Sequence, residues 1–524
     1  MGPARDIHVI IHFETHTMTR APLFVTTIYG HAYAPFLAPH LQSICEAYPD
    51  AEGLVLWQDL PEDEVRVVSR AYPRFTFRRT ALELGGGIHQ RIPRKLHAWL
   101  AACEEHPGRP LYLLDCDTLV RKPFERLLGD GWDVVYTWKD EARPINTGVM
   151  LMRDSVVART VLGEMAERVE RIVRDPAALE LAVAASGAAD QHALREMIGF
   201  CNYDRDVARD VVGQRVVFRG VPCAVLNETN CREITDDLCV IHYKTGWHPI
   251  LFDGSPWTVN RPKERCRAMF EAWQAMRLAS DRRVTSGFVS SACARHRERY
   301  AAIADRYEER GILHSEMLAV CAVCTEMGVD TVIESGRARG QSTLTLARYF
   351  EGSGVGVSSI ELMRDKDAAY AEQRLAGMPG LELLYGDSLE LIPRLIEGMP
   401  GKRMAVLLDG PKGAVAIDLA KRLFRDHAGV VAIFIHDMRA GTPQRPALEE
   451  AHGRVFFTDD DAFVSSYGDL DRVCLPGDEA SITMHTWRPH MKGHDAIGSY
   501  GPTLGVLLRD TQRVPQRVVA AAAA

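Results

Sequence analysis

The fold is decided by one stretch of the sequence, Leu111-Tyr112-Leu113-Leu114-Asp115-Cys116-Asp117. Its apolar first part predicts a short buried β-strand. Two carboxylates, Asp115 and Asp117, follow where that strand should end, and charge at such a place is costly unless a cation compensates it. A hard divalent metal that carries a diphosphate is the natural candidate. Asp-rich turns are also common, so Asp117 could instead cap a turn before Thr118.

The composition predicts a globular protein with two or three domains. The chain has 524 residues, of which 46% are hydrophobic and 25% are charged. The formal net charge of −8 implies no broad basic field, so nucleic acid is not expected as a partner. No apolar run approaches the roughly 18 residues of a membrane span, and the first residues do not have the pattern of a signal peptide.

The cysteines indicate a reducing environment. Twelve of them are scattered along the chain without a framework-like spacing, so we expect free thiols and a cytoplasmic location. Cys321 and Cys324 form a C-x-x-C pair inside a helical pattern, with no second pair nearby. We interpret them as buried structural thiols, with a redox or zinc site as the alternative.

Alternating strand and helix patterns predict an α/β protein with two Rossmann-like domains. We expect a first domain at residues 1–280 with a mostly parallel sheet, a helical connector at 281–312 and a second domain at 313–524. The expected strands are 23–28, 53–58, 111–114, 133–137 and 147–152 in the first domain and 331–334, 354–360, 381–385, 404–408 and 430–435 in the second. Helices are expected around residues 34–48 and 93–105 in the first domain.

Further polar residues lie where a ligand of the first domain would bind. Thr27 and Tyr29 belong to a polar turn that ends the first strand, and ligands bind outside the carboxyl ends of parallel strands. Lys95 lies early in the helix expected before the strand that ends in the D-x-D motif of Asp115 and Asp117, where it could reach a phosphate. Asn146 precedes a strand in Pro144-Ile145-Asn146-Thr147-Gly148, and Asp190 precedes Gln191.

The last of these features is the segment Val240-Ile241-His242-Tyr243-Lys244-Thr245-Gly246. A histidine such as His242 on an apolar run is often a satisfied core residue. With two carboxylates elsewhere in the domain it is also a candidate third metal ligand. Two carboxylates and one imidazole suit Mn²⁺ better than Ca²⁺, which prefers oxygen ligands.

Together these elements, over roughly residues 22–260, resemble the GT-A glycosyltransferases, in particular the glycogenin-like and galactosyltransferase-like retaining family. The resemblance implies a nucleotide-sugar donor, with a UDP-sugar as the expected one, and Mn²⁺ or Mg²⁺ held by Asp115, Asp117 and His242. It also implies a glycan or a glycosylated small molecule as acceptor. The family usually has His-Phe-x-Gly, whereas here Gly246 lies four residues after His242.

The same resemblance implies roles for the remaining residues of the first domain. Lys244 and the Gly246 amide would contact the diphosphate, although the shifted glycine departs from the family pattern. Asn146 and Asp190 would address the sugar or the acceptor. A retaining enzyme needs no dedicated base, whereas an inverting one could use Asp190 or Asp140.

The second domain carries a different glycine-rich loop in Val332-Ile333-Glu334-Ser335-Gly336-Arg337-Ala338-Arg339-Gly340-Gln341-Ser342-Thr343. It is not the G-x-G-x-x-G pattern of dinucleotide binders, which argues against a nicotinamide-dependent oxidoreductase. The loop resembles motif I of class I S-adenosylmethionine-dependent methyltransferases, over about residues 313–470. Glu334, Gly336, Gly340 and Ser342 would then bind the cofactor.

Acidic residues follow the next strands of the second domain. Glu361 would meet the ribose hydroxyls of S-adenosylmethionine, and Asp387 would meet the adenine. The branch with macrocin O-methyltransferase implies that Asp409 and Asp437 hold a divalent metal and that His436 acts as a base. Gly410-Pro411-Lys412-Gly413 departs from the acid-rich run of that branch.

We therefore predict a bifunctional enzyme that transfers a sugar and methylates a sugar hydroxyl, for example in polysaccharide or natural-product assembly. In one alternative the second domain is a non-catalytic binding or oligomerisation module. In another the first domain is inactive and the chain is mainly a methyltransferase. A homo-oligomer is a further expectation.

Overall fold

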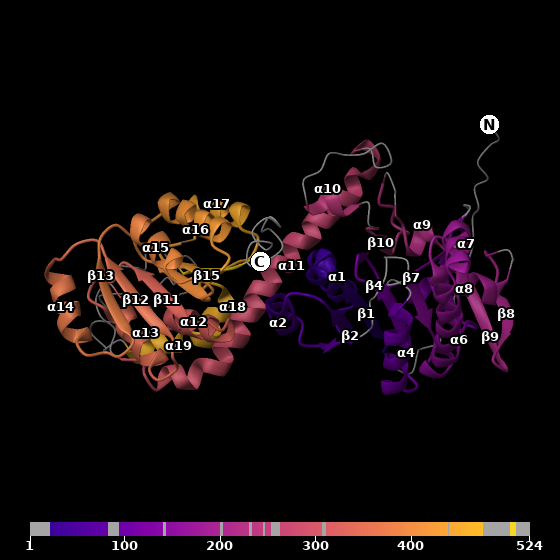
Figure 1. Ribbon diagram of the computed structural model, residues 1–524, viewed down its shortest axis with the longest axis horizontal. Coiled ribbons are helices and arrows are strands. Elements are labelled where there is room, and N and C mark those ends of the chain that lie inside the picture. Colours follow the sequence, from indigo (N-terminus) through magenta and orange to yellow (C-terminus); the bar gives the residue numbers. More distant parts are fainter. Residues whose placement is uncertain are drawn as a thin grey trace. The chain divides into compact units, whose positions relative to one another are not determined.

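The chain folds into two compact α/β units, residues 1–65 with 72–280 and residues 66–71 with 281–524. The structure is a computed structural model (Figure 1). It describes residues 21–81, 94–139, 143–199, 203–229, 233–244, 247–252, 263–305, 311–438, 440–474 and 504–509. In these ranges no helix is both long and apolar enough to cross a membrane.

The first unit is built on an eight-stranded sheet in the order β3-β2-β1-β4-β7-β6-β9-β8. The strands are β1 (Leu23–Tyr29), β2 (Glu52–Gln58), β3 (Phe75–Arg79), β4 (Leu111–Asp115), β6 (Val134–Trp138), β7 (Ile145–Met152), β8 (Val207–Val211) and β9 (Gln214–Pro222). The first four are parallel, but β7 runs antiparallel to both β4 and β6. The sheet is therefore mixed, and the expectation of a mostly parallel sheet holds only for its first half.

Helices accompany the strands of this unit. They are η1 (His31–Tyr33), α1 (Ala34–Ala47), α2 (Glu62–Ala71), α4 (Lys95–Glu105), α5 (Glu125–Leu128), α6 (Ser155–Arg174), α7 (Pro176–Ser186), α8 (Ala189–Ile198), α9 (Cys223–Leu226), α10 (His248–Phe252) and α11 (Lys263–Ala301). Residues 66–71 of α2 and 281–301 of α11 belong to the second unit. Asp154 caps α6 by accepting hydrogen bonds from Val156 N and Val157 N. Buried residues of α4, α6 and α8, such as Trp99 and Met165, form one core with the sheet.

Two features of this topology position a site. The strand order turns between β1 and β4, and such a switch point is where open α/β sheets bind ligands. In addition, β5 (Thr118–Val120) pairs antiparallel with β10 (Val240–His242), with His242 opposite Thr118. This short ribbon brings a distant histidine next to the turn that follows β4.

The second unit contains a seven-stranded sheet in the order β13-β12-β11-β14-β15-β17-β16. The strands are β11 (Thr331–Ser335), β12 (Gly356–Glu361), β13 (Leu381–Tyr385), β14 (Met404–Leu408), β15 (Val430–Ile435), β16 (Val455–Phe457) and β17 (Gly505–Leu508). The first five are parallel, whereas β17 is antiparallel to both of its neighbours. The order turns between β11 and β14, which creates a second switch point.

The helices of the second unit are α12 (His314–Glu326), α13 (Gln341–Phe350), α14 (Lys366–Leu375), α15 (Ser388–Glu397), α16 (Ala414–Asp426), α17 (Gln444–Ala451), α18 (Asp461–Tyr467) and α19 (Asp469–Cys474). Cys321 and Cys324 are fully buried free thiols on α12. Burial raises the pKa of Cys321 well above its usual value, as expected of an unreactive structural thiol.

The segment expected as a separate connector has a different form. Helix α11 begins at Lys263, well before residue 281, and continues without a break to Ala301. The boundary between the units falls inside this helix, after Ser280. No proline interrupts the sequence between 263 and 301, which allows one long helix.

Candidate functional site

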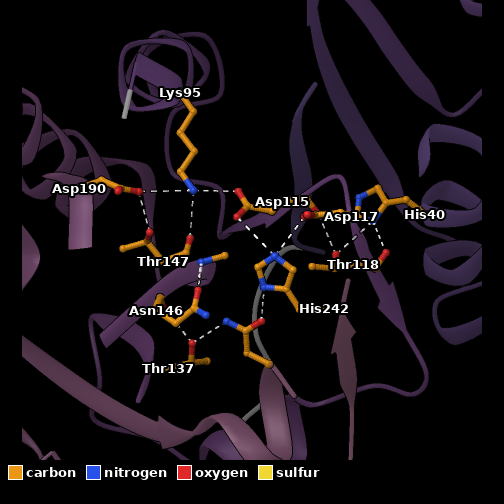
Figure 2. A network of polar contacts seen from close by, with 12 residues as sticks. His40, Lys95, Asp115, Asp117, Thr118, Thr137, Asn146, Thr147, Asp190 and His242 are labelled. Atoms are coloured by element: carbon orange, nitrogen blue, oxygen red, sulfur yellow. Dashed lines mark hydrogen bonds and ion pairs between the residues drawn. The ribbon is translucent and has the colours of Figure 1, made fainter. Parts of the chain in front are cut away.

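Asp115, Asp117 and His242 converge at the carboxyl end of β4 (Figure 2). Nε2 of His242 lies 3.1 Å from Oδ1 of Asp117 and 4.0 Å from Oδ2 of Asp115. Each residue offers one ligand atom, and all three atoms lie within 4.8 Å of one another. Two carboxylates and one imidazole in this geometry could hold a single divalent ion.

A directional chain of hydrogen bonds fixes the tautomer of His242. The Thr137 hydroxyl donates to the Asn146 carbonyl at 2.8 Å, so its oxygen accepts from Nδ2 of Asn227 at 2.9 Å. The Asn227 amide oxygen therefore faces Nδ1 of His242, at 2.9 Å, and accepts its proton. Because Nδ1 keeps its proton, Nε2 is the nitrogen that could supply a lone pair to a metal held by the carboxylates.

The electrostatics of Asp117 favour its charged form. Its side chain is nearly buried, and burial alone would raise the pKa. The neighbouring His242 outweighs this effect and holds the pKa of Asp117 below its usual value. Asp117 is therefore ionised at neutral pH, as a ligand must be.

Lys95 lies at the start of α4, as predicted, and its side chain contacts two carboxylates. Its Nζ is 2.8 Å from Oδ1 of Asp115 and 3.5 Å from Oδ2 of Asp190, and its side chain is only 5% exposed. Burial opposes its charge, but the two carboxylates outweigh burial and raise the pKa of Lys95. The lysine therefore orients Asp115 through Oδ1, and its predicted contact with a phosphate stays a prediction.

Two polar atoms next to this cluster are buried without a partner. Nδ2 of Asn146 and Oδ1 of Asp190 find no hydrogen-bond partner in the part of the chain that the structure describes. The opposite atoms are fixed, because Oδ1 of Asn146 accepts from Gly148 N at 2.9 Å and Oδ2 of Asp190 accepts from the Thr147 hydroxyl at 2.6 Å. One donor and one acceptor are thus left for a ligand.

The other predicted ligand contacts lie around this cluster. Thr27 is paired with Asp115 across β1 and β4, and Tyr29 ends β1 half-buried. Lys244 is half-buried two residues after His242, and burial followed by repulsion from Lys139 lowers its pKa. Gly246 lies outside the described residues, as does Asp140.

Three residues of the site escaped the sequence analysis. Asn227 had no signal, because its partner His242 comes from another strand. Gly148 lies inside β7, and a glycine in a strand often marks a close approach. His40 of α1 gave no signal, because it lies among mostly apolar residues of that helix. It links β1 to the DxD turn, with Nε2 2.6 Å from the Thr26 hydroxyl and Nδ1 2.8 Å from the Thr118 carbonyl.

The glycine-rich loop of the second unit lies at the switch point between β11 and β14. Gly336 has φ +91°, and a Cβ there would lie 2.8 Å from Gly410 N. Gly340 has φ +79° and approaches Ala371 of α14. Ala338, also in the loop, has φ +44°, a strained value for a non-glycine residue that is found more often at functional sites.

The acidic residues around this loop differ in what they contact. Glu334 is fully buried and accepts hydrogen bonds from the Thr343 and Ser359 hydroxyls, and Ser342 contributes another. These bonds hold the fold around the loop, and Oε1 of Glu334 is buried without a hydrogen-bond partner among the described residues, so the predicted contact with a cofactor stays a prediction. Glu361 accepts from Ala338 N at 2.8 Å and Leu362 N at 2.9 Å.

Asp387 has a local structural role in addition to any contact with a cofactor. Its exposed carboxylate accepts from Leu389 N at 2.9 Å and so caps α15. An N-cap carboxylate has remaining acceptor capacity, so the predicted contact with adenine stays a prediction.

Asp409, His436 and Asp437 also come together, at the ends of β14 and β15. Nδ1 of His436 lies 2.7 Å from Oδ1 of Asp409, and Nε2 lies 3.4 Å from Oε2 of the buried Glu316. Burial opposes the charge of His436, but Glu316 and Asp409 outweigh it and raise the pKa to about 10. A protonated His436 would have to lose this proton before it could act as a base, so the predicted role of base stays a prediction.

Comparison with known proteins gives structural neighbours only. No protein-family model matches the chain, and no curated protein matches it. Solved structures that resemble it include the glycosyltransferase GlyE of Streptococcus pneumoniae TIGR4, at 10% identity and a TM-score of 0.35, over 75% of this chain and 94% of that one. Another is the galactosyltransferase LgtC in complex with donor and acceptor sugar analogs, at 15% identity and a TM-score of 0.30, over 49% of this chain and 95% of that one. At these TM-scores the likeness identifies neither the family nor the function of this chain.

Proposed function

We propose that the first unit transfers a sugar from a nucleotide-sugar donor to a glycan or a glycosylated small molecule, with a divalent metal. The observation that carries this proposal is the convergence of Asp115, Asp117 and His242 at the switch point beside β1. A Mn²⁺ or Mg²⁺ ion bound there would neutralise the charge that builds on the diphosphate as the sugar bond breaks.

The residues around the three ligands support the same reaction. Asn146 Nδ2 would donate to a hydroxyl of the donor sugar or acceptor, and Asp190 Oδ1 would accept from one. Lys244 lies near both carboxylates and would contact the phosphates, since burial and Lys139 favour an anionic neighbour for it. We propose retention of configuration, because attack on the leaving-group face needs no dedicated base and Asp190 is already paired with Lys95.

Hydrolysis and transfer assays test this proposal. A panel of UDP-sugars is incubated with Mn²⁺, and release of the nucleoside diphosphate is followed for the wild type and Asp117→Asn. Asp50→Asn is the matched control, since the Asp50 side chain is 95% exposed on the same unit. We expect turnover that requires Mn²⁺ and is lost only in Asp117→Asn. Equal turnover in Asp117→Asn, or none with any nucleotide sugar, would contradict the proposal.

For the second unit we propose binding of S-adenosylmethionine and methylation of a sugar hydroxyl. The specific support is the glycine-rich loop at the β11–β14 switch point, together with Glu361. The Glu361 carboxylate is held by two backbone amides and retains lone pairs for two ribose hydroxyls. The alternative is a non-catalytic binding or oligomerisation module.

Calorimetric titration with S-adenosylmethionine separates the two versions. We expect binding by the wild type and a loss of at least about tenfold in Glu361→Ala, the effect of removing charged hydrogen bonds. Glu382→Ala, on the neighbouring strand β13, is the control. Failure of the wild type to bind would leave the module as the better description. A cytoplasmic location and a homo-oligomer stay predictions.

A further inference from the structure

The acidic cluster of the second unit already contains a cation. Lys412 lies on the loop after β14, and its Nζ contacts Oδ1 of Asp409 and lies 2.6 Å from Oδ2 of Asp437. These two carboxylates are the ones that, with His436, have the composition of a metal site. The ammonium thus takes the position between them that a divalent ion would need.

The donor set does not fit a metal in this arrangement. Nδ1 of His436 and the Lys412 ammonium both face Oδ1 of Asp409, so a divalent ion could reach that carboxylate only by displacing the lysine. A divalent ion beside the Lys412 ammonium would also meet a like charge at contact distance. The cluster therefore disagrees with the metal site that the sequence resemblance implied for Asp409 and Asp437.

We propose that Lys412 is a built-in cation that replaces a divalent metal in the second unit. A lysine ammonium has three N–H donors, and two of them serve Asp409 and Asp437. The third remains for an oxygen ligand, because the Lys412 side chain is 48% exposed. We assign that position to the hydroxyl of an alcohol acceptor, and this assignment rests on the methyl transfer proposed above.

The location supports this assignment. Asp409 N and Gly410 N donate to the Ser335 carbonyl at 2.8 and 3.1 Å. A Cβ on Gly336 would lie 2.9 Å from the Asp409 carbonyl carbon. The Lys412 cluster therefore adjoins the glycine-rich loop, so a cofactor on the loop and a hydroxyl at Lys412 would be neighbours.

The number of Mn²⁺ ions that the chain binds tests the assignment of Lys412 as the cation, and this test needs no activity assay. Mn²⁺ binding to the full chain is measured from the spectrum of free Mn²⁺, in an Asp117→Asn background that removes the site of the first unit. We expect no bound ion in Asp117→Asn and one ion in Asp117→Asn/Lys412→Ala. The control is Asp117→Asn/Lys421→Ala, because Lys421 and Asp418 form an i, i+3 pair like Lys412 and Asp409, at 3.8 Å on the surface.

Two results would overturn the cation assignment. One is an ion bound by Asp117→Asn that is lost on adding Asp409→Asn. The other is no ion in the Lys412→Ala double variant although its thermal midpoint shows that it is folded. Neither result depends on transfer activity, so they are distinct from failure of the proposed function.

The hydroxyl assignment has its own readout. With methyl transfer to glycosides measured in EDTA, we expect wild-type activity without metal, and a KM for the acceptor about tenfold or more higher in Lys412→Ala. An activity that EDTA abolishes and Mn²⁺ restores, or an unchanged KM in Lys412→Ala, would refute it. Absence of all methyl transfer would refute the assigned acceptor and leave the metal count to decide the cation.

Discussion

Gly148→Ala should disable the metal site of the first unit without touching a ligand residue. Gly148 lies on β7, behind the imidazole of His242. A Cβ added at Gly148 would lie 2.5 Å from Cε1 and 2.7 Å from Nδ1 of His242, and 3.0 Å from Oδ2 of Asp115. Two of the three candidate ligands are therefore displaced by one methyl group.

The size of the effect follows from these distances. An ordinary contact begins near 3.4 Å, so the imidazole must move by about 0.9 Å. It cannot yield easily, since it is buried and Asn227 holds its Nδ1 at 2.9 Å. Functional groups have to stay within about 0.5 Å of their working geometry, and a disturbed metal ligand typically weakens binding by about 10- to 100-fold. We expect a loss of Mn²⁺ affinity in this range, about 1.4 to 2.7 kcal/mol.

Mn²⁺ titration of the wild type and Gly148→Ala measures this loss, with far-UV circular dichroism to confirm folding. Gly163→Ala is the matched control. Gly163 lies on α6, and a Cβ added there meets no heavy atom of the described residues within 4 Å. The Gly163→Ala variant should therefore bind Mn²⁺ normally and gain up to about 1 kcal/mol of helix stability. A folded Gly148→Ala with wild-type affinity would refute the placement of His242 beside Asp115.

Three other predictions follow from the same site. Asn227→Ala should weaken Mn²⁺ binding by about 10-fold or more, because the proton on His242 Nδ1 loses its acceptor, and titration calorimetry measures it. Burial lowers the pKa of His40 from 6.5 to about 4, so the unfolded chain takes up a proton first as the pH falls. Stability of about 3 kcal/mol that is present above pH 6.5 is then lost by pH 4, and His40→Gln should show a smaller loss in denaturant unfolding. Lys95→Met should destabilise the first unit by about 3 kcal/mol or more, because it leaves the carboxylates of Asp115 and Asp190 without their cation. The exposed Lys402→Met should not destabilise the protein, and thermal unfolding compares the two variants.

Much of the strand pattern could be predicted from local sequence. Short apolar runs such as Leu111–Leu114 become buried strands because their side chains have no polar face to present to water. The direction of each strand in the sheet could not be predicted in the same way. β7 has the same kind of apolar pattern as β4 but runs antiparallel to it, and periodicity carries no information about direction. This is why the first sheet is mixed.

The three candidate metal ligands could also be predicted from the sequence. Asp115, Asp117 and His242 are polar residues at the ends of apolar runs, where strands end and ligands bind. The residues that contact these ligands could not be predicted in this way. Asn227 and Gly148 act on His242 across strands, and no spacing along the chain encodes such a contact.

The two lysines show most clearly where sequence ends and tertiary structure begins. The sequence alone placed Lys95 early in the helix before Asp115, where it could reach a phosphate, and placed Lys412 in a run where acidic residues were expected. Only the fold decided which anion each one meets. Lys95 is buried against Asp115 and Asp190, and Lys412 bridges Asp409 and Asp437. The reason is physical: a charge is paired according to distance in space, and the sheet, not the chain order, sets that distance.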